Sequence, residues 1–212
     1  MEFPNAPGSF VHHSAKVDPG AALSRGVIIG PNVVIEAGVW IGAYSVIGDG
    51  PPEHSEYFDD LNNERTFGVH IKKGARIFQH ATIHAGIERP TMIGEGACVM
   101  RHCHVAHDCT VERGAIISGG SSLAGYVWVM TKAIVGAHSI VHQHCVIGAY
   151  AFLGMGSGLH AHVPPGEKWL GFPARRMGFN DVGLMRAGMT LNGCVALHFG
   201  MFEHLSEVSK LK

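Results

Sequence analysis

Residues 93–117 read IGEGACVMRHCHVAHDCTVERGAII, and every sixth residue of this stretch is aliphatic. The spacing continues to residue 159 without a miss. The twelve positions are Ile93, Val99, Val105, Val111, Ile117, Leu123, Val129, Val135, Val141, Ile147, Leu153 and Leu159. An amphipathic helix would need a period near 3.6 residues and a simple strand a period of 2. A period of six is typical of a β-helix in which each aliphatic side chain points inward.

The same period appears earlier in the chain, in two shorter runs. Their aliphatic positions are Val11, Val17, Leu23, Ile29, Ile35, Ile41 and Ile47, and then Ile71, Ile77 and Ile83. The gap between these runs, residues 48–70, contains six acidic residues, and a second, shorter interruption at residues 88–90 shifts the phase by four. We expect both interruptions to be loops that leave the scaffold, where binding residues often lie.

Three hexapeptides form one triangular coil of 18 residues, and successive coils stack as parallel strands about 4.8 Å apart. The predicted fold is therefore all-β: a parallel β-helix over residues 1–178, with a loop insertion at about 48–70. Residues 179–212 are predicted to form a short helical segment, because Leu197, Met201, Leu205 and Val208 recur at helical spacing.

The composition excludes several classes of protein. Hydrophobic residues make up 46% of the chain and charged residues 16%, which favours a packed core over disorder. The formal net charge of -1 gives no basic field for nucleic acid. The five cysteines are an odd number and form no C-x-x-C pair, so a disulfide framework is not expected and a reducing compartment fits better. We find no signal peptide and no apolar run of about 18 residues, so a cytoplasmic protein without an integral membrane segment is expected.

Sixteen histidines are present, and their densest cluster is residues 101–109. Because Val105 points inward, His104 and His107 are expected on the outer face or at a corner. Residues 18 apart share a column, which places His107 beneath Gly125. A histidine is suited to general-base catalysis near neutral pH. Neighbours on a strand point to opposite faces, however, so the spacing does not by itself predict a bond between His107 and Asp108.

The stretch HVAHDCTV at residues 104–111 closely resembles the signature of bacterial UDP-N-acetylglucosamine O-acyltransferases, the first enzymes of lipid A synthesis. Further similar motifs are LAG at 123–125, VHQ at 141–143, CVIGA at 145–149, SG at 157–158 and VPP at 163–165. The resemblance covers roughly residues 10–190. It implies a left-handed β-helix and a homotrimer with active sites between subunits. It also implies acyl transfer from acyl carrier protein to a hydroxyl of a UDP-N-acetylglucosamine-type nucleotide sugar.

The resemblance also implies roles for individual residues. His107 would be the general base, Asp108 its supporting carboxylate, and the Gly125 N–H the donor that stabilises the oxyanion. The substrate-binding positions would be His104, Tyr126, His142, Gln143, Met155, Asn180 and Arg186. Met155 stands at the position that measures acyl length, which predicts a short to medium 3-hydroxyacyl group. No metal or cofactor is implied beyond the acyl thioester of acyl carrier protein or coenzyme A.

Several departures from the family pattern leave alternatives open. Tyr126 stands where the family has a histidine, and Ala187 where an arginine is usual. The family stretch that reads the acyl 3-hydroxyl is not recognisable at residues 52–57, and the helical tail is shorter. One alternative is therefore an acyl-coenzyme A-dependent N-acyltransferase of a nucleotide amino sugar.

Two further alternatives come from the histidines themselves. By the spacing of 18, His84, His102, Gly120 and His138 share one column. A γ-type carbonic anhydrase-like enzyme could hold Zn²⁺ with His84, His102 and His107 across a subunit interface. The last alternative is a scaffold trimer in which the histidines only pack between subunits.

Overall fold

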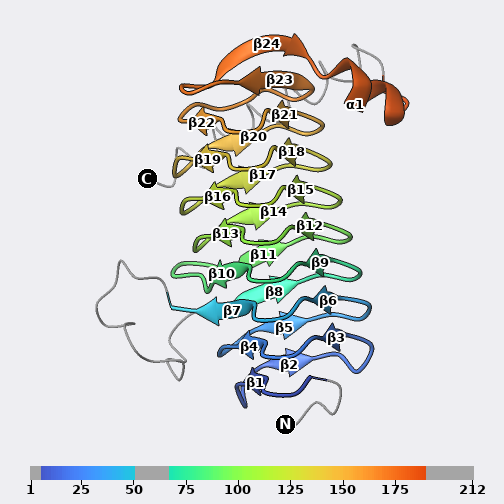
Figure 1. Ribbon diagram of the computed structural model, residues 1–212, viewed down its shortest axis with the longest axis vertical. Helices are drawn as coiled ribbons and strands as arrows, with labels where there is room; N and C mark the ends of the chain where they lie inside the picture. The colour runs from blue at the N-terminus through green and yellow to red at the C-terminus, as the bar shows by residue number, and fades with distance from the viewer. Residues whose placement is uncertain (1–5, 51–66, 190–212) are drawn as a thin grey trace.

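The structure is a computed structural model that describes residues 6–50 and 67–189 (Figure 1). Most strands have two or three residues, and each is followed by a tight turn or a loop. The chain rises coil by coil, so the strands stack into three sheets that enclose a prism (Figure 1). The predicted all-β parallel β-helix is thereby confirmed.

Each strand pairs in parallel with the strand three places later, except at the C-terminal end. The first sheet contains β1 (Phe10–Val11), β4 (Ile28–Ile29), β7 (Val46–Asp49), β10 (Thr82–His84), β13 (His104–Val105), β16 (Ser122–Leu123), β19 (Ile140–Val141) and β22 (Gly158–Leu159). The second contains β2 (Lys16–Val17), β5 (Val34–Ile35), β8 (Val69–Ile71), β11 (Thr91–Ile93), β14 (Thr110–Val111), β17 (Trp128–Val129) and β20 (Val146–Ile147). The third contains β3 (Ala22–Leu23), β6 (Trp40–Ile41), β9 (Arg76–Ile77), β12 (Cys98–Val99), β15 (Ile116–Ile117), β18 (Ile134–Val135), β21 (Phe152–Leu153), β23 (Glu167–Leu170) and β24 (Arg175–Phe179).

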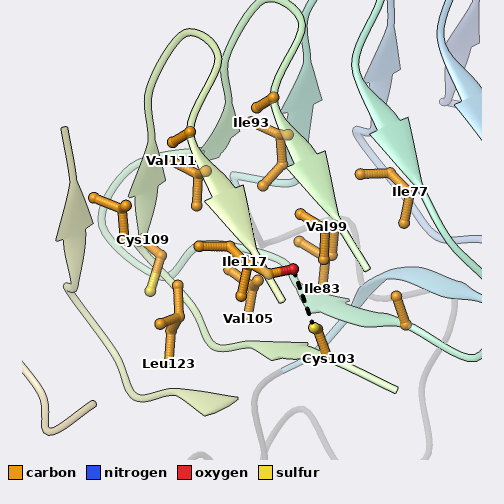
Figure 2. Close-up of a cluster of buried hydrophobic side chains, with 14 of the residues drawn as sticks. Ile77, Ile83, Ile93, Val99, Cys103, Val105, Cys109, Val111, Ile117 and Leu123 are labelled. Atoms are coloured by element: carbon orange, nitrogen blue, oxygen red, sulfur yellow. Dashed lines mark hydrogen bonds between the residues drawn. The ribbon is translucent and has the colours of Figure 1, made fainter. Parts of the chain in front are cut away.

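The hexapeptide aliphatics form the core of the prism. In a two-residue strand such as β13 or β15, the first residue faces outward and the second faces inward. Figure 2 shows Val105, Ile117 and Leu123 converging from the sheets, and all three are fully buried. Every coil therefore adds a layer of aliphatic side chains above the previous layer, which drives the stacking by burial of apolar surface.

Ile117 lies in a central coil, and we expect Ile117→Ala to lower the free energy of unfolding by about 2–5 kcal/mol, because it removes buried methylenes and leaves a cavity. Chemical denaturation of the two proteins measures this loss. The matched control is Ile116→Ala, since Ile116 is the outward-facing residue of the same strand. Equal losses for both variants would contradict the assignment of Ile117 to the core.

The turns between the first and second sheets form one edge of the prism, which we call the first edge. Most strand pairs are offset by 18 residues, as in His104↔Ser122, but Thr82 pairs with His104 and is offset by 22. The four extra residues lie in the loop between β10 and β11. The longer interruption lies between β7 and β8, and its residues 51–66 fall outside the described residues. Both insertions thus leave from the first edge.

The offset of 22 corrects one column predicted from the sequence. His80, and not His84, lies beneath His102, with the two rings parallel and their centroids 5.0 Å apart. His84 lies on β10 instead, with its ring 4.6 Å from the ring of His104. The four-residue shift was recognised in the sequence, but the column arithmetic did not include it.

The C-terminal end of the described chain departs from the hexapeptide pattern. β23 pairs in parallel with β21 and antiparallel with β24, a pairing that the sequence did not predict. A short helix, α1 (Asp181–Arg186), follows with Asn180 as its N-cap (Figure 1). The helical pattern predicted at Leu197–Val208 lies outside the described residues. No helix in the described part of the chain is long and apolar enough to cross a membrane.

Candidate active site

His107 and Asp108 form a hydrogen-bonded pair in the turn between β13 and β14, on the first edge. The His107 Nδ1 and the Asp108 Oδ2 are 2.7 Å apart. His107 is 8% exposed and Asp108 is fully buried. The opposite-face argument does not apply, because these residues form a turn and not a strand, and Asp108 adopts a φ of 57°. The turn therefore brings both side chains to one side.

The Asp108 carboxylate is also held by the loop that precedes β11. Its oxygens accept hydrogen bonds from the backbone N–H groups of Ile87 (3.1 Å), Glu88 (3.0 Å) and Arg89 (2.9 Å). Such donors stabilise a buried carboxylate in its charged form. A carboxylate at Nδ1 favours the tautomer in which Nε2 of His107 is the basic nitrogen. The pair therefore has the polarity that general-base catalysis needs.

Gly125 lies directly against the His107 imidazole, as the spacing of 18 predicted. A Cβ atom at residue 125 would lie 2.7 Å from both Cε1 and Nε2 of His107. Within the described residues, the Gly125 N–H has no hydrogen-bond acceptor, whereas its carbonyl accepts the His144 N–H at 3.1 Å. The site thus places a basic nitrogen beside an available amide donor. A base and an oxyanion donor are the two groups that acyl transfer requires.

Tyr126 lies on the same edge, between the rings of His107 and His144. Its ring lies edge-on to His107, with centroids 5.1 Å apart, and stacks on His144 at 4.7 Å. Burial, followed by the negative charges of Asp108 and Glu88, raises the pKa of Tyr126 to about 12. Tyr126 therefore remains a neutral phenol throughout the physiological pH range, unlike the histidine found there in the resembling family.

This raised pKa predicts a pH dependence of stability. Because the pKa of Tyr126 in the folded protein, about 12, exceeds the ordinary tyrosine pKa of 10.0, the folded protein retains the phenol proton where the unfolded chain releases it. The stabilisation is present below pH 10 and is lost as the pH rises toward 12. We expect the thermal midpoint to fall more steeply with pH in this window for the wild type than for Tyr126→Phe. If the thermal midpoint fell equally with pH in the wild type and in Tyr126→Phe, the raised pKa of Tyr126 would be contradicted.

Three other predicted site residues lie near His107 on the first sheet or the first edge. His104 projects from β13, and its Nδ1 is 2.8 Å from the Thr82 Oγ1. His142 and Gln143 follow β19, two coils above His107, and both are exposed. Gln143 occupies the same turn position as Gly125 in the next coil. These side chains extend the site upward along the edge.

The remaining predicted residues lie elsewhere on the chain. Met155 is 76% exposed in the turn after β21, on the edge between the third and first sheets. Asn180 caps α1, because its Oδ1 accepts the Gly183 N–H at 3.2 Å and its Nδ2 donates to the Tyr150 carbonyl at 2.8 Å. Arg186 is exposed in the last turn of α1. One chain alone does not bring these residues to His107.

The structure separates the histidines proposed as zinc ligands. His102 stacks on His80 at the edge between the third and first sheets, whereas His84 lies against His104. Over residues 6–50 and 67–189 of a single chain, no group of three His, Cys, Asp or Glu side chains is arranged to hold a metal ion. One chain therefore does not bring His84, His102 and His107 together as a set of zinc ligands.

The buried cysteines belong to the core and not to the site. Cys103 and Cys109 pack among the aliphatic residues in Figure 2, where the Cys103 thiol donates to the Ile117 carbonyl at 3.6 Å. Burial raises the pKa of Cys109 to about 12 and also raises that of Cys103. A thiol with a high pKa is a poor nucleophile at neutral pH.

Sequence reasoning missed the contribution of Glu88 and Arg89. The Arg89 guanidinium donates to the Asp108 carbonyl through Nη2 (3.2 Å) and, more weakly, Nε (3.4 Å). Glu88 lies close enough to Tyr126 to affect its pKa. The phase shift at residues 88–90 was the one signal of this loop in the sequence, and it gives no information about which atoms the loop contacts.

Comparison with known proteins relates the chain to one family. The chain is 37% identical over 207 residues to the acyl-acyl-carrier-protein–UDP-N-acetylglucosamine O-acyltransferase of Halorhodospira halophila, covering 85% of this chain and 78% of that protein. It is 34% identical to the protein of the same name from Alkalilimnicola ehrlichii, covering 82% and 76% of the two chains. No model of a protein family matches the sequence.

Solved structures give the same result. The UDP-N-acetylglucosamine acyltransferase of Francisella novicida superposes with a TM-score of 0.70 at 27% identity, covering 90% of this chain and 75% of that one. The UDP-N-acetylglucosamine O-acyltransferase of Moraxella catarrhalis superposes with a TM-score of 0.68 at 26% identity, covering 97% and 90%. With this fold, this sequence similarity and this histidine edge, the chain belongs to the UDP-N-acetylglucosamine O-acyltransferase family and is an acyltransferase.

Proposed function

We propose that the chain transfers an acyl group from the thioester of acyl carrier protein to a hydroxyl of UDP-N-acetylglucosamine. The observation that carries this proposal is the His107 imidazole, bonded to Asp108 through Nδ1 and lying against Gly125. The names of the relatives supply the two substrates. We assign the chain to a lipid A-type pathway on the same basis.

The geometry supports an acyl-transfer step in which His107 takes a proton from the sugar hydroxyl and returns it to the leaving thiolate. Nε2 of His107 accepts the proton of the sugar hydroxyl while the hydroxyl oxygen forms a bond to the thioester carbonyl carbon. Asp108 stabilises the resulting imidazolium, and the Gly125 N–H donates to the oxyanion of the tetrahedral intermediate. The intermediate collapses as the C–S bond breaks, and the imidazolium returns its proton to the leaving thiolate. The thioester itself is the activated group, so no other cofactor takes part in this scheme.

A homotrimer is part of the proposal, because the predicted site residues lie on separate parts of one chain. His107 and Gly125 lie on the first edge, whereas Met155 lies on the edge between the third and first sheets. In a threefold assembly of prisms, the first edge of one copy can face that other edge of its neighbour. Sedimentation equilibrium should give three times the mass of one chain. We place the enzyme in the cytoplasm, where nucleotide sugars and acyl carrier protein occur together.

This function is tested by comparing two acyl donors and two acceptors and identifying the product that forms. Purified protein is incubated with a 3-hydroxyacyl-acyl carrier protein or the corresponding coenzyme A thioester, together with UDP-N-acetylglucosamine or a UDP-amino sugar. Mass spectrometry and alkaline lability of the product then distinguish an ester from an amide. Ester formation from the carrier protein donor is expected. Faster amide formation from the coenzyme A donor would replace this proposal with N-acyl transfer.

Met155 gives a prediction about acyl length. We propose that its side chain, which is 76% exposed in a single chain, shortens the acyl pocket formed with a neighbouring copy. We expect Met155→Gly to move the preferred donor by at least two carbons toward longer chains, since each methylene that becomes buried contributes about 0.8 kcal/mol. A donor panel from 8 to about 16 carbons, compared by kcat/KM, measures the shift. An unchanged optimum, or a wild type that prefers the longest donor, would contradict this role.

A further inference from the structure

The loop between β10 and β11 makes its principal contacts with a single residue of the candidate site. We call residues 86–90 the clamp loop. Oδ1 of Asp108 accepts the N–H groups of Glu88 and Arg89, while Oδ2 accepts the Ile87 N–H as well as facing His107. The Arg89 guanidinium binds the Asp108 carbonyl. Both ends of Asp108 are therefore held by the clamp loop.

We propose that Arg89, together with the clamp-loop amides, is a positioning group: it holds Asp108 and thereby orients the imidazole of His107. This inference rests on the proposed role of His107 as the general base. Arg89 does not touch the reacting atoms. It acts through the backbone of the residue that binds Nδ1, so its effect is transmitted over two contacts.

The local conformation explains why Asp108 needs support from outside its own turn. Its φ of 57° is in the left-handed region, which an aspartate adopts at some cost. Its carboxylate is fully buried and would be strongly destabilising without donors. Three backbone amides supply the compensating hydrogen bonds to the carboxylate, and the Arg89 guanidinium binds the backbone carbonyl of the same residue. Because both carboxylate oxygens have directed partners, the carboxylate cannot rotate and Oδ2 stays aimed at Nδ1 of His107.

The clamp loop is itself anchored to the scaffold. The Gly86 N–H donates to the Gly68 carbonyl at 3.0 Å, and the Phe67 N–H donates to the Gly86 carbonyl at 3.0 Å. A side chain at residue 86 would collide with the Arg89 carbonyl oxygen, so the loop requires glycine there. The four-residue insertion is thus a tight, defined turn over the His107 edge.

The first test compares Arg89→Gln, Arg89→Lys and the control Arg113→Gln. Arg113 is, like Arg89, an exposed arginine, and it lies in a regular hexapeptide turn on another edge. For Arg89→Gln we expect kcat to fall about 10-fold to 100-fold with KM for both substrates unchanged within about twofold, as expected when a catalytic base is misaligned. Arg89→Lys should recover part of the loss, and Arg113→Gln should match the wild type. A wild-type kcat for Arg89→Gln would overturn the proposal.

The second test does not depend on turnover. Long-range ¹H–¹⁵N spectra of the histidine rings report the tautomer of each imidazole, and a His107→Gln spectrum identifies the His107 signals. In the wild type we expect one tautomer with the proton on Nδ1, and in Arg89→Gln a mixture or exchange broadening. Unchanged His107 signals in Arg89→Gln would overturn the positioning role. Failure of the wild type to transfer acyl groups would instead overturn the proposed function and leave this spectrum interpretable.

A deletion of residues 87–90 provides an independent variant. It brings Ile83 and Ile93 to a spacing of six, so the hexapeptide pattern becomes continuous while the clamp-loop donors to Asp108 are lost. We expect the β-helix to persist in circular dichroism and the His107 signals to show mixed tautomers. A single Nδ1-protonated tautomer in the folded deletion variant would count against the proposal. A deletion variant that does not fold leaves Arg89→Gln as the deciding variant.

Discussion

Replacing His107 by alanine is expected to lower kcat/KM by about three orders of magnitude, since a positioned general base contributes 10²–10⁴-fold. The reason is the geometry of the pair: His107 is 8% exposed and bonded at Nδ1 to a fully buried carboxylate, and Nε2 lies beside Gly125. His70 is also bonded to a carboxylate, that of Glu36 at 2.8 Å, but the Glu36 side chain is 39% exposed. Initial rates of ester formation from acyl-acyl carrier protein and UDP-N-acetylglucosamine measure the loss.

The matched control is His80→Ala. His80 is also a turn histidine with aromatic neighbours, but it lies on the edge between the third and first sheets and stacks on His102 and Tyr44. We expect His80→Ala to keep kcat/KM within about twofold, as for surface substitutions away from the site. Both variants should retain cooperative thermal unfolding. Activity of His107→Ala within tenfold of the wild type would exclude His107 as the general base.

The fold could be predicted from the sequence because the aliphatic positions of the hexapeptide repeat are the buried positions of the core. Positions such as Val111, Ile117 and Leu123 are six apart and fully buried, and nothing else in the chain competes with that signal. The alignment of His107 with Gly125 followed from the same period, since both lie in regular coils. Wherever the period of six holds, adding 18 to a residue number gives the residue that lies above it in the next coil.

Counting in steps of 18 residues does not locate neighbours where the hexapeptide period is interrupted. The four extra residues before β11 moved His84 away from His102 and placed His80 there. The same loop supplies backbone N–H groups to Asp108. The residue types in a sequence do not reveal which backbone N–H groups will act as donors. The spacing did not predict the bond between His107 and Asp108, which only the family resemblance implied, because the bond depends on a left-handed φ at residue 108. Turn geometry, and not residue type, decided each of these features.

Gly125→Ala is expected to reduce kcat by about 10²–10³-fold, comparable to the loss of one oxyanion-hole donor. The new methyl group would lie 2.7 Å from Cε1 and Nε2 of His107. Asp108 and the turn hold the imidazole, so relief of the clash must move either the ring or the Gly125 amide. Gly119→Ala is the matched control: it has the same turn position one hexapeptide earlier, and its methyl group would meet no atom closer than 3.4 Å. We expect Gly119→Ala to retain most of the wild-type activity.

A double-mutant cycle separates this clash from a general effect of alanine at the turn. Overpacking costs about 1–3 kcal/mol, so Gly125→Ala should lower the free energy of unfolding by that amount in the wild type. In a His107→Ala background the imidazole is absent, and the same substitution should cost almost nothing. The coupling energy between residues 107 and 125 should therefore be about 1 kcal/mol or more, as for residues in contact. An additive cycle would mean that the glycine and the histidine do not touch, and the proposed alignment of base and oxyanion donor would then be lost.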